Sequence, residues 1–539
     1  MHLQRIRTAI VAALALMGAT AGAQAQLLKI GLASEPTAMD PHYHQVTPND
    51  SMVSHIFETL VGQDAQMKLV PQLAASWKAL DDNTWEFKLR EGVKFSNGQP
   101  FTAQDVIFTL CRMSHNPQTI SGSYSTITRN VASIETPDDH TLIFKTQAPD
   151  PLLPAGLTRG GMLWSGIVQH GKIVFEKKGQ CGVTGEWPTI EDFNSGKDAI
   201  GTGPYTLKSY VKGVGIDLER NDGYWGKKPE WKEVKLLPVP NAGPRLAGLL
   251  AGDFDVIESP AARDLPRIKS NPKLGYVATP SSRVVFFQLD VGRDNSPQVK
   301  APNGKNPLQD LRVRQAISMA IDRKTIVARI MDGAATPAYQ FLPDGMFGAL
   351  PHAPEIQYDP EGAKKLLAEA GYPKGFEMTL SATNDRYIND AQVAQAVAQY
   401  LTRVGIRTSV DTMTRSIFFP RRAKLDFSFA MGGWSSDTAE ATSFLQYWVT
   451  SYAPDLGLGT SNYGRYGNPE LDTVLRKALV TVNDAERDKL ERQAVQMAMA
   501  DLPSIPLHFE SSIWAFRKGL AYEGRADQFT LATSVKSVR

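Results

Sequence analysis

Apolar and polar residues alternate over residues 85–90, which is the pattern of a strand with one buried face. The pattern returns at residues 134–144, around a turn at 137–140. Between these segments Thr102 precedes a helical run of apolar residues and is a favoured N-cap. Hairpins joined by a helix predict an α+β module in the first third of the chain.

Other segments have the periodicity of helices or the short apolar runs of strands. We expect helices at 50–60, 245–251, 311–331, 359–371 and 483–499, and strands at 28–32, 205–208, 216–220, 234–240 and 284–290. A segment rich in Pro, Gly and Asn at 296–307 predicts a domain boundary.

The pattern changes to strand–helix–strand after residue 375. Strands are predicted at 376–382, 406–411 and 425–430, with an Ala- and Gln-rich helix at 389–404. Strands that alternate with helices predict a largely parallel sheet. Ligands of such sheets bind beyond the carboxyl ends of the strands. Two loops would meet there, one with Arg386 and one that runs from Gly433 to Asp437.

The second of these loops has the composition of a ligand site. The apolar strand ends in Gly432 and Gly433, and Trp434, Ser435, Ser436 and Asp437 follow. Glycines let another group approach the backbone closely, Trp434 offers a flat apolar surface, and Asp437 offers one negative charge. This combination suits a small ligand with a positive group. The alternative is a glycine-rich turn with a buried Trp and a capping Asp.

The N-terminus predicts export. Arg5 and Arg7 give a basic start, residues 9–16 are apolar, and Ala23-Gln24-Ala25 matches a cleavage signal. We therefore expect residues 1–25 to be a signal peptide that is cleaved before Gln26, and the mature protein to be soluble.

Charge and composition narrow the class of partner. The chain has 539 residues with 58 basic and 56 acidic side chains. Cleavage after residue 25 removes two basic residues and leaves 56 of each sign. A balanced charge argues against nucleic acid or an anionic membrane as partner.

Several single residues have two interpretations each. Cys111 and Cys181 are the only cysteines, and in an oxidising compartment they either pair or stay buried as thiols. Tyr43 and His44 lie in a segment that is either a plain polar loop or a ligand contact rather than a metal site, because no other ligating residues support one. Tyr124 either reaches a ligand or packs on its own domain.

Motifs for catalysis are missing. The sequence has no G-x-S-x-G, H-E-x-x-H, P-loop or C-x-x-C. The glycine loop at 201–205 lacks a third glycine, and Pro204 removes a backbone donor, so phosphate binding is not expected. We expect no enzymatic activity and no cofactor, and an exported hydrolase is the remote alternative.

Seven stretches, in order along the chain, resemble the peptide/nickel-type solute-binding proteins of ABC importers. The most specific is residues 84–98, TWEFKLREGVKFSNG. The others are residues 69–77, 101–106, 201–205, 221–225, 312–317 and 365–373.

The resemblance implies an α/β, bilobal periplasmic-binding-protein fold with two hinged α/β lobes and an additional α+β domain. Domain I would comprise residues 26–65, 200–288 and 505–539, domain II residues 66–199, and domain III residues 289–504. The ligand would lie between domains I and III, which close around it.

The resemblance also implies roles for single residues. Asp437 matches the aspartate that binds a peptide's α-ammonium, and Arg386 matches an arginine that binds the α-carboxylate. Tyr124 is similar to a tyrosine that lines the dipeptide site. The Asp-Pro pair that often follows is replaced here by Thr438-Ala439-Glu440, so the choice of ligand is open.

The expected function is capture of a dipeptide or short oligopeptide in the periplasm and its delivery to permease subunits in the inner membrane. Glutathione, haem, a nickel chelate, an opine or an oligosaccharide are alternative ligands in the same role. We expect a monomer and no resident metal.

Overall fold

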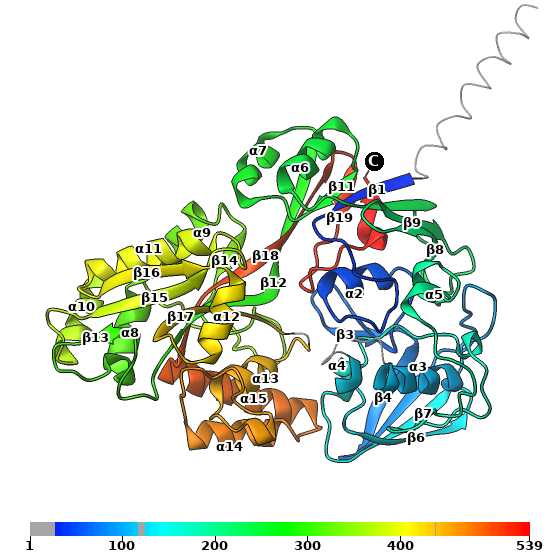
Figure 1. The fold of residues 1–539 in the computed structure, drawn as a ribbon, viewed down its shortest axis with the longest axis horizontal. Helices are drawn as coiled ribbons and strands as arrows, with labels where there is room; N and C mark the ends of the chain where they lie inside the picture. Colours follow the sequence, from blue (N-terminus) through cyan, green and yellow to red (C-terminus); the bar gives the residue numbers. More distant parts are fainter. Residues whose placement is uncertain (1–26, 117–123, 437, 539) are drawn as a thin grey trace, which may run out of the picture.

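The computed structural model describes residues 27–116, 124–436 and 438–538. The predicted signal peptide and Asp437 lie outside the described residues. Twelve of the described strands form one sheet that runs through two lobes, and four more form the sheet of a third module (Figure 1). Within the described residues, no helix is long and apolar enough to cross a membrane.

Two long strands connect the lobes. β12 (Leu274–Leu289) and β18 (Ser504–Arg517) pair antiparallel along their length. Their register shifts between Pro280 and Val284. Proline gives no N–H to the ladder, and an extra residue bends a strand. The two lobes are therefore joined at an irregular part of both strands, where bending is easiest.

The first lobe lies at one end of these strands. The sheet continues from β18 in the order β11, β1, β10, β9, β8. β1 is parallel to both of its neighbours, and β9 is antiparallel to both of its own. The elements are β1 (Leu27–Leu32), α2 (Thr47–Val53), β8 (Tyr205–Val211), β9 (Gly215–Arg220), β10 (Glu233–Pro238), α6 (Ala242–Ala251), β11 (Val256–Glu258) and α7 (Leu265–Ser270).

The second lobe lies at the other end and contains the predicted strand–helix–strand unit. β15 is parallel to β16 and β17, and β17 is antiparallel to β12. The strands are β13 (Val299–Lys300), β14 (Ala335–Pro337), β15 (Glu377–Thr383), β16 (Arg407–Met413) and β17 (Phe429–Ser435). The helices are α8 (Leu311–Met319), α9 (Arg323–Arg329), α10 (Pro360–Glu369), α11 (Asp390–Arg403), α12 (Arg415–Ala423), α13 (Ala441–Phe444), α14 (Pro469–Ala478) and α15 (Asp484–Asp501).

The third module is the predicted α+β unit. Its sheet has the order β4-β5-β7-β6, with bounds Ala74–Asp81, Thr84–Leu89, Thr141–Thr146 and Val131–Asp138. Helix α3 (Ala103–His115) packs on it and starts with a capping box of Thr102 and Asp105. Cys111 of α3 and Cys181 form a disulfide, with their Cα atoms 6.4 Å apart. The two cysteines are therefore paired and are not separate buried thiols.

Several predicted elements have different bounds, and the strand expected at 284–290 starts ten residues earlier, at Leu274. The helix expected at 50–60 ends at Val53, because the carbonyls of His55 and Ile56 accept hydrogen bonds from Tyr205 and Gly203 instead. The helix expected at 311–331 is two helices, since Asp322 caps the second through Thr325 N–H at 2.9 Å. The strand expected at 425–430 starts later, at Phe429.

Two of the family-like stretches serve packing. A Cβ atom on Gly201 would lie 2.0 Å from the carbonyl oxygen of Ile56, so only glycine fits there. The carboxylate of Glu58 accepts hydrogen bonds from Tyr224 Oη at 2.9 Å and Trp225 Nε1 at 2.7 Å. These residues fasten the loop 201–205 and the turn 221–225 to the segment after α2.

Candidate functional site

The carboxyl ends of β15 and β17 meet at the cleft between the lobes. The ring of Tyr387, in the loop after β15, covers Gly433, and a Cβ atom at that glycine would lie 2.4 Å from Tyr387 Cε1. A Cβ atom on Gly432 would meet the ring of Phe286 at 2.8 Å. The two glycines therefore leave room for the rings of Tyr387 and Phe286 to pack directly on the strand.

The residues after Gly433 are held by the second lobe. Trp434 donates a hydrogen bond through Nε1 to Ser443 Oγ at 2.9 Å, and its ring packs on Tyr447 and Trp448. Ser435 is the last residue of β17 and lies opposite Arg283 of β12. Ser436 is buried. Asp437, the predicted ammonium anchor, lies outside the described residues, so the structure gives no geometry for it.

Arg386 is exposed at the cleft. Its guanidinium carbon lies 5.5 Å from the centre of the Tyr387 ring. Among the described residues it has no carboxylate within ion-pair distance. Buried Asp390 fixes the backbone, because Asp390 Oδ2 accepts hydrogen bonds from the N–H groups of Arg386 at 3.0 Å and Tyr387 at 3.2 Å. The loop is thus rigid while its cationic end group is available.

The cleft wall around Arg386 carries charges from both lobes. A cavity of about 570 Å³ is lined by Arg386, Arg283, Glu510 and Glu258, among others. Arg283 Nε lies 3.4 Å from Glu510 Oε2. Burial raises the pKa of Glu510, and Arg283 opposes that shift. Arg283 stands where β12 changes register, so it belongs to the junction of the lobes.

A smaller cavity of about 110 Å³ leads from Arg283 to Ser435 and Ser436. Its opposite wall includes Asp50 and Arg159. Tyr124 is buried and donates a hydrogen bond through its hydroxyl to Asp50 Oδ1 at 2.8 Å. The structure thus places Tyr124 behind Asp50, where it orients that carboxylate.

Tyr43 and His44 lie just before this wall. Both are half-buried, with ring centres 6.2 Å apart, and the next residues, 45–47, line the small cavity. His44 Nδ1 is buried without a hydrogen-bond partner among the described residues. No group of three or more His, Cys, Asp or Glu side chains in the described parts of the chain is arranged to hold a metal ion.

Two cationic residues near the site, Arg283 and Arg422, could not be predicted from the sequence. The guanidinium carbon of Arg422 lies 4.8 Å from the ring centre of Tyr463, 4.9 Å from Phe419 and 5.2 Å from Trp448. No ion pair of Arg422 occurs among the described residues. Pro420 inside α12 concealed the helix that presents it.

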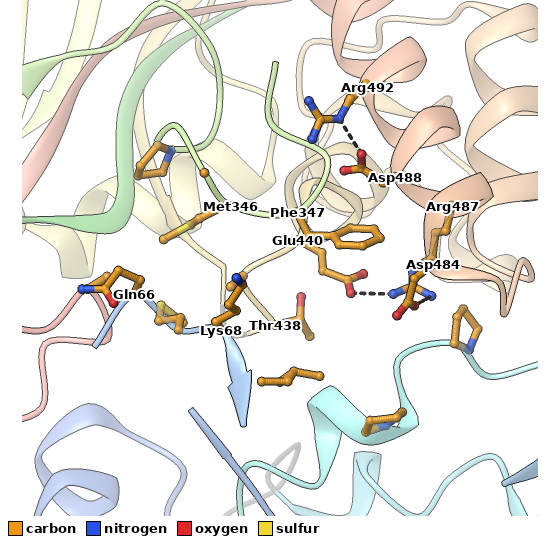
Figure 2. Close-up of a pocket in the computed structure, with 18 of the residues that line it drawn as sticks. Gln66, Lys68, Met346, Phe347, Thr438, Glu440, Asp484, Arg487, Asp488 and Arg492 are labelled. Atoms are coloured by element: carbon orange, nitrogen blue, oxygen red, sulfur yellow. Dashed lines mark hydrogen bonds and ion pairs between the residues drawn. The ribbon is translucent and has the colours of Figure 1, made fainter. Parts of the chain in front are cut away.

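A larger cavity of about 1930 Å³ lies between the third module and the second lobe (Figure 2). Its walls include Lys68 on one side and Thr438, Glu440 and Arg487 on the other. Figure 2 shows Glu440 bound to Arg487 on this wall. The residues around position 437 therefore border two spaces, the small cavity and this larger one.

Known proteins resemble the chain over most of its length. Heme-binding protein A of Haemophilus influenzae is 29% identical over 462 residues, which is 81% of this chain and 78% of that protein. The dipeptide-binding protein of Escherichia coli is 26% identical over 506 residues, or 90% of this chain and 89% of that protein.

Solved structures share the fold. The periplasmic murein tripeptide binding protein MppA, in its unliganded open form, superposes with a TM-score of 0.79 at 22% identity, over 96% of this chain and 98% of that one. DppA from Helicobacter pylori, in complex with the peptide STSA, gives a TM-score of 0.67 at 22% identity, over 95% and 98%. The predicted bilobal α/β fold is confirmed.

A family model matches residues 68–455, which include most of the third module, the β12 crossing and the strand–helix–strand unit with Arg386 and Ser436. The stretches that pointed to solute-binding proteins fall within or beside this range. The chain belongs to the bacterial extracellular solute-binding proteins, family 5.

Proposed function

We propose that this protein captures a peptide-like solute, a dipeptide or short oligopeptide, in the periplasm and delivers it to the permease of an ABC importer. The observation that carries the proposal is Arg386, an exposed guanidinium in the inter-lobe cleft whose loop is held by Asp390. Among the described residues it has no carboxylate partner within ion-pair distance, although its charge acts on the buried Glu510 carboxyl of the same cavity and lowers the pKa of that group. A ligand carboxylate would supply that partner.

The charge pattern supports a zwitterionic ligand. Arg386 would bind the α-carboxylate, and Asp437 would bind the α-ammonium. Asp50, which accepts a hydrogen bond from Tyr124 at 2.8 Å, lies on the first-lobe side, where Arg159 Nε is 3.8 Å from its Oδ2. A charge that leaves water must be paired, because an unpaired buried charge is costly. Opposite charges on the cleft walls therefore select a solute with both signs.

Lobe closure follows from this arrangement. The lobes are joined through β12 and β18 at the register shift near Pro280. A ligand that touches both walls binds the closed state better and shifts the population toward it.

A ligand with more than one carboxylate is the second candidate. Arg386 and Arg283 line the same cavity, so two cations lie near one end of the cleft. Glutathione has two carboxylates and one ammonium, and a relative named glutathione-binding protein GsiB, from Pectobacterium atrosepticum, is 27% identical.

The same proposal includes the domain limits given above, a monomeric state, and export through cleavage of residues 1–25. The strand register supports lobe limits near Pro280 in β12 and near Ser511 in β18, where the pairing shifts. These positions lie a few residues from the limits at 288 and 505.

The decisive experiment is mass spectrometry of the ligand that co-purifies with the mature protein. We expect a peptide or glutathione-like molecule that calorimetry then shows to bind without turnover. Recovery of haem, a sugar or an opine would overturn the proposed ligand class, and hydrolysis of a bound peptide would overturn the transport role.

A further inference from the structure

The loop that follows the ligand strand is fastened to α15 by a buried group of ionisable side chains. Ser436 Oγ accepts a hydrogen bond from Glu440 N–H at 3.2 Å and donates one to the Glu440 carbonyl at 3.1 Å. Glu440 is thus tied to the residue that lines the small cavity. Whatever fixes Glu440 also fixes the end of β17.

The Glu440 side chain is fixed by Arg487. Arg487 Nη2 lies 3.0 Å from Glu440 Oε1, and both side chains are almost fully buried (Figure 2). Arg487 also contacts exposed Asp484 at 2.9 Å and stacks on Phe347, with 4.6 Å between the guanidinium carbon and the ring centre. The backbone carbonyl of Phe347 in turn accepts a hydrogen bond from Ala441 N–H at 3.1 Å.

Glu491 holds the next two residues. Its Oε2 accepts hydrogen bonds from Ala441 N–H at 3.0 Å and Thr442 N–H at 3.3 Å. Its Oε1 lies 3.7 Å from Arg487 Nε. Three consecutive residues, 440–442, are therefore bound to α15 by the side chains of Arg487 and Glu491. A buried ion pair adds little net stability, because removing two charges from water offsets their attraction.

We infer that Glu440 and Arg487 are positioning residues that hold the ligand strand end in its binding geometry. The inference rests on the proposed function. It also gives a role to Glu440, in the segment where the sequence leaves the usual family pattern.

The protonation of the buried carboxyl groups beside Arg487 also depends on pH. Arg487 faces two buried carboxyl groups, Glu440 and Glu491, and exposed Asp484; the contacting residue from the neighbouring loop, Phe347, is uncharged. Burial raises the pKa of Glu440 to about 6, with Arg487 opposing. Burial and then the charge of Glu440 raise the pKa of Glu491 well above its usual value.

The sign of the pH effect separates positioning from folding. The folded protein takes up a proton at Glu440 near pH 6, before the unfolded chain does near its ordinary value of 4.5. Protonation of Glu440 therefore raises the free energy of unfolding as pH falls from about 6 to 4.5. The same protonation removes the ion pair between Glu440 and Arg487 that holds the loop. Binding should weaken on acidification while this group does not destabilise the fold.

The first test needs no ligand. Hydrogen exchange of the segment 438–445 is measured by mass spectrometry in the mature protein with Glu440→Gln, Arg487→Met or Glu486→Gln. Glu486 is an exposed control in the first turn of α15, paired with Lys477 at 2.8 Å. We expect exchange at least tenfold faster in the first two variants, wild-type exchange in the control, and similar exchange of the β15 core in all. Unchanged exchange in both Glu440→Gln and Arg487→Met would overturn the inference.

The second test uses the dipeptide Ala-Ala and glutathione as probes at pH 7.5 and 5.5. We expect the wild type to bind one of them at least fivefold more weakly at the lower pH, and Glu440→Gln to bind weakly with no pH dependence. The same pH dependence in both proteins would overturn the inference. If neither probe binds the wild type, these ligand assignments fail, and the exchange measurement still decides the positioning role. Arg487→Lys, which keeps the charge, replaces Arg487→Met if that variant does not fold.

Discussion

At the scale of single residues, several parts of the site are held in place by neighbouring side chains. Asp390 holds the loop of Arg386, Tyr124 holds Asp50, and Tyr387 covers Gly433. Only the outer groups, chiefly the Arg386 guanidinium, are left to meet a solute. This division between fixed and available groups is what preorganises a binding site.

Removing the Arg386 charge should weaken binding only of ligands with a free carboxylate. For Arg386→Met we expect a loss of about 1.5–3 kcal/mol, the worth of a charge-assisted hydrogen bond, with the co-purified peptide in calorimetry. The same peptide with a C-terminal amide in place of the carboxylate should bind the wild type and Arg386→Met equally weakly. Arg407→Met, which removes an exposed arginine paired with Glu377 at 3.0 Å, is the control. Equal loss for peptide and amide would contradict the assignment.

Adding one methyl group to Gly433 should be costly. A Cβ atom there would lie 2.4 Å from the buried ring of Tyr387, which must shift. We expect Gly433→Ala to lower the free energy of unfolding by about 1–3 kcal/mol, measured by urea denaturation. Gly243→Ala is the matched control, because nothing lies within 4 Å of its added methyl and alanine suits α6. Equal stability of both variants would show that Tyr387 does not pack on Gly433.

At the scale of elements, the sequence predicted most helices and strands from their periodicity. The strand pattern at 85–90 and the capping box at Thr102 appear as expected. The failures have tertiary causes. The helix after Asp50 stops because distant Gly203 and Tyr205 take its carbonyls, and α12 was missed because it contains Pro420.

The site itself was only partly predictable. Parallel strands bring the loops of Arg386 and Ser436 together, and the order of strands and helices was enough to expect that. Arg283 and Arg422 were missed, because one enters from the long crossing strand and the other from the unrecognised helix. A local sequence pattern does not show which residues from distant segments of the chain will lie at the site.

The disulfide should stabilise the third module. It joins residues 70 apart, and closing a loop of that length is worth about 4 kcal/mol in the chain-entropy model. We expect Cys111→Ala/Cys181→Ala to lower the unfolding free energy by up to this amount. Reductant should destabilise the wild type in the same way and leave the double variant unaffected. An unchanged wild type under reducing conditions would contradict this account.

His508 makes β18 sensitive to acid. It is fully buried, neither ring nitrogen has a hydrogen-bond partner among the described residues, and burial lowers its pKa to about 3. Below the ordinary value of 6.5 the unfolded chain takes up a proton and the folded protein does not. Its contribution to stability is therefore complete above pH 6.5 and is lost as pH falls.

The variant His508→Leu should remove that dependence. Between pH 6 and 4 the unfolding free energy of the wild type should fall by up to about 1.4 kcal/mol per pH unit more than that of the variant. Urea denaturation at each pH measures the difference. Parallel curves for the two proteins would show that His508 titrates normally in the folded state.

At the scale of the whole molecule, two lobes and a third module surround one charged cleft. The continuous sheet lets β12 and β18 act as both scaffold and hinge, since each strand belongs to both lobes. The cavity of about 1930 Å³ lies between the third module and the second lobe, so closure of the lobes would change its shape as well. Family membership fixes the solute-binding role, and our proposal is that the cleft charges set the choice of solute.

The central claim is that a solute bound between the lobes closes them. Small-angle X-ray scattering of the mature protein, freed of ligand and then titrated with the co-purified molecule, tests it most directly. The account predicts a radius of gyration that falls with ligand and saturates at one molecule per chain, and no such fall with Arg386→Met at the same concentration. A radius of gyration that stays constant while calorimetry shows saturation would contradict it.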